Sequence, residues 1–444
     1  MSATRILGSQ RDRLRGVYRG WWIVLVAYYT QLISAGAGGW VFGVLILSMQ
    51  EDLGWSQTTV VGVLVANRWI GGLLSVPLGP VVDRYGSRVL MTASAVLAGV
   101  ALIGVAFSSS VFMFYAAWAL YGVAHPGVAM LGPRVAIANW FIRKRAQAFV
   151  LFTLGSATAG IAAAPAAGWI DVQYGWRLVW LILGCMSFTV APLAWWAVRR
   201  RPEDVGLLPD GDRPQAADGS GAAAKPPAYE APWTVRQALR TRAFWLVTAG
   251  FLLVAMPSSA IFINISGFVQ SHGFSRELGA TVVSAYGFGV LLGRPVWGVF
   301  LARIGLHRTM VAFAVIYAVS IAVFAFQTGL VGIFITVLWL GIAIAGSQLM
   351  NAQAMPDYFG RRIVGTLTGY SQLANVAVGG SAPLITAAVF DATGGYVPAF
   401  LFFAAACGVA GLSFFFAPPP VHPDERDGGG GTTPAEDTPA RAAV

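Results

Sequence analysis

The sequence predicts an all-α membrane protein with twelve transmembrane helices in two pseudo-symmetric six-helix bundles. Three features predict this fold: an apolar composition, repeated apolar runs of membrane-spanning length, and an internal repeat. Apolar residues make up 57% of the 444 residues and charged residues only 11%, whereas a soluble domain carries about 25% charged residues. Because lipid offers no hydrogen-bond partners to the backbone, each spanning run is expected to be helical.

Each half of the chain contains six apolar runs of about 20 residues, the length that a helix needs to cross a bilayer. The predicted spans of the first half are 19–48, 58–80, 89–107, 111–138, 146–170 and 176–197. Those of the second half are 243–270, 277–300, 309–327, 330–354, 363–390 and 396–417. The first run exceeds the roughly 7–15 apolar residues of a signal peptide, so it is expected to be a span.

The remaining segments are two tails and a linker. We expect an N-terminal tail at 1–18, a first bundle at 19–197 and a linker at 198–242. A second bundle at 243–417 and a C-terminal tail at 418–444 follow. Proline and glycine recur along the linker, which predicts irregular structure, and the glycine run near residue 430 predicts a disordered tail.

The distribution of basic residues predicts the orientation in the membrane. With both termini in the cytoplasm, 24 of the 29 Lys and Arg residues fall in inner loops and tails, and two fall in outer loops. This asymmetry follows the positive-inside rule and predicts a multi-pass protein of the bacterial inner membrane. The net charge of +10 therefore reflects topology, and no nucleic-acid partner is expected. The two cysteines, Cys185 and Cys407, form no metal-ligand pattern, and we expect no metal and no cofactor.

Three segments recur at a nearly constant offset and indicate a duplicated six-helix unit. The segment 79–88 returns at 298–308, and 139–143 returns at 357–361. Asp171 and Gly175 return as Asp391 and Gly395. Repeats of this kind are found in many secondary transporters, which hold the substrate between the halves near the middle of the membrane.

The segment Gly79 to Arg88, with its Gly, Asp-Arg, Gly and Arg, resembles the loop signature of the major facilitator superfamily. Within the superfamily, the chain resembles the bacterial monocarboxylate porters and oxalate/formate antiporters. That resemblance rests on 201–211 (RPEDVGLLPDG), 358–361 (YFGR), 391–396 (DATGGY) and the pair Arg294-Pro295. It implies the major facilitator fold and alternating access.

Away from their end residues, the predicted spans contain Arg68, His125, Arg134 and Arg294 but no Asp or Glu, since the acids fall in loops, tails or span ends. Ionisable groups inside a membrane are costly and are candidates for functional residues. A guanidinium stays charged and binds a carboxylate through two parallel hydrogen bonds. Positive charge without acids in the spans therefore predicts an anionic substrate.

The family resemblance implies that Arg294 binds the substrate carboxylate, although an arginine near a helix end can also extend to the interface as an anchor. Arg68 and His125 are further candidates, for the substrate pathway or for hydrogen bonds within the bundle. Arg134 fits a packing or gate role better. Animal monocarboxylate transporters carry an Asp where this chain has Val290, so their proton relay is not carried over.

Polar residues in other spans are candidates for lining the cavity, or alternatively for joining helices. The substrate-binding candidates among them are Asn264, Tyr286, Asn351, Tyr370 and Gln372.

A second group of charges lies in the inner loops, at Asp83, Arg84, Arg88 and Arg303. We expect these four residues to form an inner gate, with topology determination as the alternative. Because Ala302 replaces Asp83 in the second repeat, the gate should be stronger in the first half.

The predicted function is secondary active or facilitative transport of a small, monocarboxylate-like organic anion by a monomer, with a proton or a counter-anion as a possible partner. The alternatives are an exporter of drugs or other solutes with the same fold, and a non-transporting membrane receptor. The sequence contains no phosphate-binding loop and no pair of carboxylates within the spans, so neither feature favours an enzyme. We expect no catalytic residues.

Overall fold

The computed structural model describes residues 18–211, 233–379 and 382–420. Within these ranges the regular structure is entirely helical, as predicted. The elements of the N-terminal half are α2 (Arg19–Ala35), η1 (Gly36–Trp40), α3 (Val41–Leu53), α4 (Gln57–Tyr85), α5 (Ser87–Ala106), α6 (Val111–His125), η2 (Pro126–Met130), α7 (Leu131–Trp140), α8 (Arg145–Thr158), η3 (Ala159–Ala163), α9 (Ala164–Tyr174) and α10 (Trp176–Ala197).

The second half follows the linker and repeats the order of the spans. The described linker residues form the turns η4 (Glu203–Val205) and η5 (Pro209–Gly211) and the helix α11 (Val235–Arg240). The elements that follow are α12 (Arg242–Ser271), α13 (Arg276–Ile304), α14 (Leu306–Ala325), α15 (Leu330–Phe359), α16 (Val364–Gly379), α17 (Ala382–Thr393) and α18 (Val397–Phe415).

Eleven helical segments of the described chain are long and apolar enough to cross a membrane. The predicted eleventh span, 363–390, is built by α16 and α17, which flank residues outside the described ranges. Several helices continue beyond the predicted spans, so that Asp83, Asp171 and Asp357 lie in helical end turns and not in loops. Helix ends tolerate these acids because backbone groups and water remain accessible there.

The internal repeat is visible in the lengths and ends of the helices. Helices α4 and α13 each contain 29 residues, and α5 and α14 each contain 20. Ser56 and Ser275 both cap the following helix by accepting a backbone N–H. Gly86 and Gly305 both adopt positive φ, of 83° and 79°, which a residue with a side chain would adopt only with strain. The two halves therefore share their local structure as well as their sequence motifs.

The halves differ where the fourth span of each crosses the membrane. In the first half this span is interrupted by the π-helical turn η2, which begins at Pro126 directly after His125. Pro126 has no N–H to donate to the preceding turn, which favours such a break. Helix α15 is continuous at the equivalent position, where the sequence reads Ile344-Ala345-Gly346.

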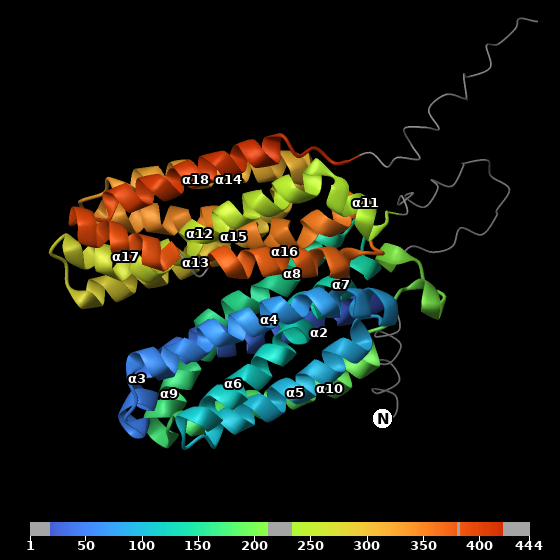
Figure 1. The fold of residues 1–444 in the computed structure, drawn as a ribbon, viewed down its shortest axis with the longest axis horizontal. Coiled ribbons are helices and arrows are strands. Elements are labelled where there is room, and N and C mark those ends of the chain that lie inside the picture. Colours follow the sequence, from blue (N-terminus) through green and yellow to red (C-terminus); the bar gives the residue numbers. More distant parts are fainter. Residues whose placement is uncertain (1–17, 212–232, 380–381, 421–444) are drawn as a thin grey trace, which may run out of the picture.

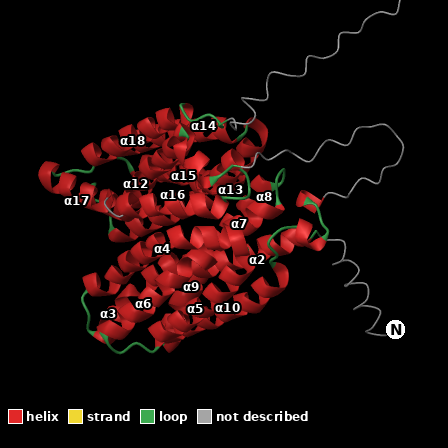
Figure 2. Cartoon of the chain, turned by 45° about the vertical axis from the view of Figure 1, so that its right-hand side comes forward, coloured by secondary structure: helices red, strands yellow, loops and turns green. Residues whose placement is uncertain are grey.

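The two bundles lie against one another, with the N-terminal half in blue to green and the C-terminal half in yellow to red (Figure 1). Helix α4 packs against α16 and helix α8 packs against α13, so one helix pair on each side joins the halves. A second view shows α7 and α8 beside the C-terminal bundle (Figure 2). We call the end of the molecule at which α10 enters the linker and α12 leaves it the linker side, and the opposite end the far side.

Candidate functional site

The linker side of α4 is tied to the start of α16 by Asp83. Its carboxylate accepts hydrogen bonds from the backbone N–H groups of Gly365 and Thr366, both at 2.8 Å, and from the Thr366 hydroxyl at 2.7 Å. These donors belong to the first turn of α16, where the helix dipole favours a negative charge. Asp83, predicted as a gate residue, thus lies between the two halves.

Glycines let the two helices approach at this contact. A Cβ atom on Gly79 would lie 2.7 Å from the carbonyl oxygen of Gly365, so the backbones touch without an intervening side chain. About one helical turn before Gly79 on α4, the hydroxyl of Ser75 donates a hydrogen bond to the carbonyl of Gly369 at 3.0 Å. Small residues at such spacing are typical of close helix packing in membranes.

Two arginines absent from the predicted gate also join the halves on the linker side. The buried Arg145, at the start of α8, pairs with Asp357, near the end of α15, at 2.5 Å. Arg361 donates to the Asn139 carbonyl of the first half at 2.9 Å and pairs with Glu203 of the linker at 3.3 Å. The sequence places these charges near the inner helix ends, but their pairing depends on which ends meet in space.

The start of the linker is docked on the loop between α7 and α8. The Asp210 carboxylate accepts hydrogen bonds from the backbone N–H groups of Ile142, Arg143 and Lys144 at 3.2, 2.8 and 3.0 Å respectively. Asp210 is only 4% exposed and has a left-handed φ of 62°, a conformation that Asp tolerates better than most residues. The RPEDVGLLPDG segment therefore belongs to the folded linker side and is not purely irregular.

The other predicted gate residues have partners within their own half or are exposed. Arg88 donates to the Trp195 carbonyl at 2.9 Å and lies 3.8 Å from the Trp195 ring centroid. Arg84 lies 5.4 Å from the ring of its neighbour Tyr85. Arg303, at the end of α13, is exposed.

Arg294 lies between the halves, in the middle part of α13. Ten residues separate it from the end of the helix at Ile304, or about 15 Å at the rise of an α-helix. The residue is only 3% exposed. Its guanidinium donates to the backbone carbonyl of Thr153 on α8 of the other half, and its Nε atom has no partner within the described chain. Arg294 is thus held by a neutral group and keeps an unused donor.

Arg134 is also held by a neutral partner from the opposite half. It donates to the Asn351 side-chain oxygen on α15 at 3.0 Å, and its Nε is buried and unpaired within the described residues. Asn351, predicted as a substrate ligand, is therefore occupied by Arg134 in this conformation. No Asp or Glu of the described chain forms an ion pair with Arg134 or Arg294.

Arg68 and His125 lie deeper than Arg134. Arg68 is seven residues before Ser75 on α4, so the two share a helix face; Ser75 is buried against α16, whereas Arg68 is exposed. This change in exposure indicates that the halves separate between the two levels. His125 packs against α4, where its Nδ1 atom lies 3.5 Å from the position of a Cβ atom on Gly71. The imidazole is close enough to Arg68 and Arg134 to interact with their charges.

The remaining substrate candidates are distributed over three helices. Tyr286 on α13 is buried, with its ring 5.8 Å from the Phe262 ring. The Asn264 amide donates to Ala260 within its own helix at 2.8 Å. On α16, Gln372 is buried and Tyr370 is 39% exposed. The assignment of Asn264, Tyr286, Tyr370 and Gln372 as substrate ligands stays a prediction.

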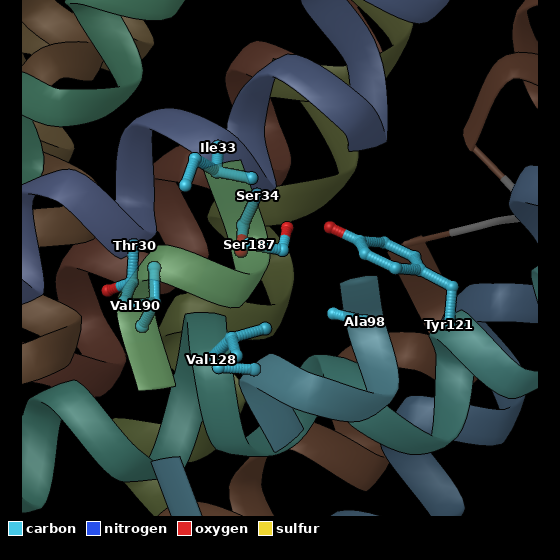
Figure 3. Close-up of a pocket in the computed structure, with 9 residues that line it drawn as sticks. Thr30, Ile33, Ser34, Ala98, Tyr121, Val128, Ser187 and Val190 are labelled. Carbon is cyan, nitrogen blue, oxygen red and sulfur yellow. The ribbon is translucent and has the colours of Figure 1, made fainter. Parts of the chain in front are cut away.

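A small pocket lies inside the N-terminal bundle rather than between the halves (Figure 3). Four hydroxyl groups line it, and the Tyr121 hydroxyl points toward Ser34 and Ser187 across it. The remaining lining residues are apolar, so the pocket suits a buried water more than an organic anion. Its lining residues are Thr30, Ile33, Ser34, Ala95, Ala98, Tyr121, Val128, Ser187 and Val190.

Comparison with known proteins places this arrangement in a family. The sequence profile of the Major Facilitator Superfamily matches residues 29–282 and 250–442. The chain belongs to the major facilitator superfamily. The gallate transporter of Pseudomonas putida is 24% identical over 76% of this chain and 77% of its own. The membrane sensor protein UhpC of Salmonella typhimurium is 23% identical over 72% of this chain and 73% of its own.

Solved structures of the superfamily share the fold. The structure of the proton:xylose symporter XylE matches with a TM-score of 0.69 at 14% sequence identity, over 90% of this chain and 96% of that chain. At this identity the likeness concerns the fold alone. This chain is therefore a superfamily member whose solute depends on its own residues.

Proposed function

We propose that this superfamily member transports a small organic anion across the bacterial inner membrane by alternating access, and that Arg294 binds the anion's carboxylate. The observation that carries the proposal is a pair of arginines between the halves, the buried Arg294 and the partly buried Arg134, whose partners are neutral and whose buried Nε atoms are unpaired. A buried charge without a counter-charge costs several kcal/mol. An arriving carboxylate supplies the missing charge and gains bidentate hydrogen bonds.

The same conformation supports the transport cycle. Asp83 and the Arg145–Asp357 pair hold the linker side together. The excess of positive residues assigns the linker side to the cytoplasm. In the proposed cycle this conformation is the state closed toward the cytoplasm, and inward opening breaks these contacts.

The names of two relatives support an organic anion without identifying it. The gallate transporter of Pseudomonas putida carries an aromatic carboxylate by name. The likeness to the sensor UhpC favours a second candidate, a membrane receptor for an anionic solute. A receptor binds its solute without accumulating it, so transport and binding measured together separate the two functions.

The test is uptake by the purified full-length chain in liposomes. A panel of labelled formate, oxalate, lactate and benzoate covers small and larger, aliphatic and aromatic carboxylates, with labelled arabinose as a neutral control. We expect saturable uptake of at least one carboxylate and none of arabinose. Binding of a carboxylate without uptake would favour the receptor, and uptake of arabinose alone would contradict an anion carrier.

A further inference from the structure

Three aromatic rings meet across the two halves at a level closer to the far side than Arg294. The indole of Trp40 lies 5.9 Å from the Phe262 ring at an interplanar angle of 75°. Phe262 belongs to α12, and its ring lies 5.8 Å from that of Tyr286 on α13. We call Trp40, Phe262 and Tyr286 the aromatic wall. It joins the first span of one half to the first two spans of the other.

The backbone around Trp40 is shaped to place this ring between the halves. Trp40 ends the π-helical turn η1 and packs over Gly160, where a Cβ atom would lie 3.0 Å from the indole. Gly160 itself belongs to the π-helical turn η3. On the opposite side, a Cβ atom on Gly287 would lie 3.9 Å from the ring. Two π-helical turns packed together are unusual, and such turns occur frequently at functional sites.

The aromatic wall and Arg294 lie at a distance that one aryl carboxylate can bridge. Tyr286 and Arg294 share α13 and are eight residues apart, which corresponds to about 12 Å along the helix axis. The arginine side chain covers part of this distance, and a carboxylate attached to a ring covers the rest. Phe262 is 38% exposed, so its ring is not fully covered by protein.

We propose that the aromatic wall determines specificity and that the transported anion is an aryl carboxylate of the benzoate class. The inference rests on the proposed role of Arg294 in binding the carboxylate. Aromatic rings attract one another edge to face beyond their area of contact, so the wall favours a flat ring over a saturated ring of similar size. Arg294 then recognises the charge and the aromatic wall recognises the ring.

The experiment compares labelled benzoate with labelled cyclohexanecarboxylate in liposomes that contain the full chain. We expect kcat/KM to favour benzoate by about tenfold in the parent, as a few ring contacts allow. Trp40→Leu should raise the KM for benzoate about fivefold, keep its kcat, and leave the KM for cyclohexanecarboxylate within about twofold. Trp40→Phe should restore the preference, and Trp169→Leu, at a 63% exposed far-side tryptophan, should change neither substrate.

Each alternative outcome overturns a defined part of the proposal. Equal transport of both acids by the parent, with loss of both in Arg294→Gln, would leave the anion carrier intact and contradict the aromatic wall. An equal fall in kcat for both acids in Trp40→Leu would make the rings a gate without selectivity. If the parent transports neither acid nor any other carboxylate, the proposed function and this inference fail together.

Discussion

The two helix pairs that join the halves are equivalent by the internal repeat but use different chemistry. At α4 and α16, Asp83 caps the start of α16 and Ser75 donates to the Gly369 carbonyl. At α13 and α8, the residue equivalent to Asp83 is Ala302, and the residue equivalent to Ser75 is Arg294. One contact therefore carries the negative charge and the other carries the positive charge.

This difference separates two tasks. A carboxylate on helix N–H groups closes a contact that is complete without a ligand. A guanidinium on a single carbonyl leaves hydrogen-bonding capacity that a ligand can use. We infer that the α4–α16 contact serves mainly to close the linker side, and that the α13–α8 contact serves mainly to bind the anion.

The largest expected effect comes from substituting Arg294 at the α13–α8 contact. Arg294→Gln removes the charge that binds the carboxylate and should lower kcat/KM for carboxylate uptake about 100-fold, consistent with losing a charged hydrogen-bonded pair. Arg294→Lys keeps the charge but loses the bidentate geometry and should fall between parent and Arg294→Gln. Ser75→Ala, at the equivalent position, should remain within about threefold of the parent. Equal losses in Arg294→Gln and Ser75→Ala would make Arg294 a packing residue.

Asp83→Asn should weaken closure on the linker side without abolishing binding. Hydrogen bonds to a charged group contribute about 1.5–3 kcal/mol, so the ratio of closed to open molecules should fall roughly tenfold or more. Alkylation of Val150→Cys, beside Gly298 at the other contact, reports this opening in a chain with Cys185 and Cys407 replaced by Ala. Asp52→Asn removes an ion pair with Arg177 on the far side and serves as the control. Unchanged alkylation in Asp83→Asn, or loss of binding, would contradict a gate role.

Ala302→Asp should have a smaller effect of opposite sign. It places at the α13–α8 contact the carboxylate that Asp83 supplies at α4–α16, and helix N-termini gain about 0.3–1 kcal/mol from a nearby negative charge. Alkylation of the Val150→Cys reporter should slow about two- to fourfold. Ala302→Asn lacks the charge and should behave like the parent. Faster alkylation in Ala302→Asp would show that the two contacts are not equivalent in geometry.

The smallest effect is expected from the linker. Asp210→Asn keeps the shape of the side chain but removes the negative charge that accepts hydrogen bonds from three backbone N–H groups of the loop before α8. Protease cleavage within 203–211 should increase a few-fold, since local release requires only these contacts. Transport should change less than in Asp83→Asn. Protection equal to that of the parent would mean that the Asp210 charge does not hold the linker.

The sequence predicts the fold and the charged residues better than their partners. Apolar runs, the repeat and the charge asymmetry predict the helices of both halves because each can be seen in the order of residues without the packing. Arg294 and Asp83 are also recognisable, one as an ion in an apolar run and the other in a loop signature. Their partners, the Thr153 carbonyl and the N–H groups of α16, are backbone atoms that any residue provides, so no sequence pattern marks them.

The same limit applies to the Arg145–Asp357 pair and to Trp40. Arg145 and Asp357 each resemble ordinary charges at the ends of helices, and only the packing of α8 against α15 brings them together. Trp40 follows a run of small residues, Gly36-Ala37-Gly38-Gly39, which predicts close packing but not a π-helical turn. Contacts between segments more than 100 residues apart require the assembled bundles.

Direct binding to the purified protein tests most simply whether Arg294 recognises a carboxylate. Calorimetric titration with benzoate and with benzamide, which differ in charge but hardly in shape, separates the charge from the ring. We expect the parent to bind benzoate at least tenfold more tightly than benzamide, and Arg294→Gln to bind both with the weak affinity of benzamide. Equal affinity of the parent for the two ligands, or an unchanged benzoate affinity in Arg294→Gln, would contradict anion binding by Arg294.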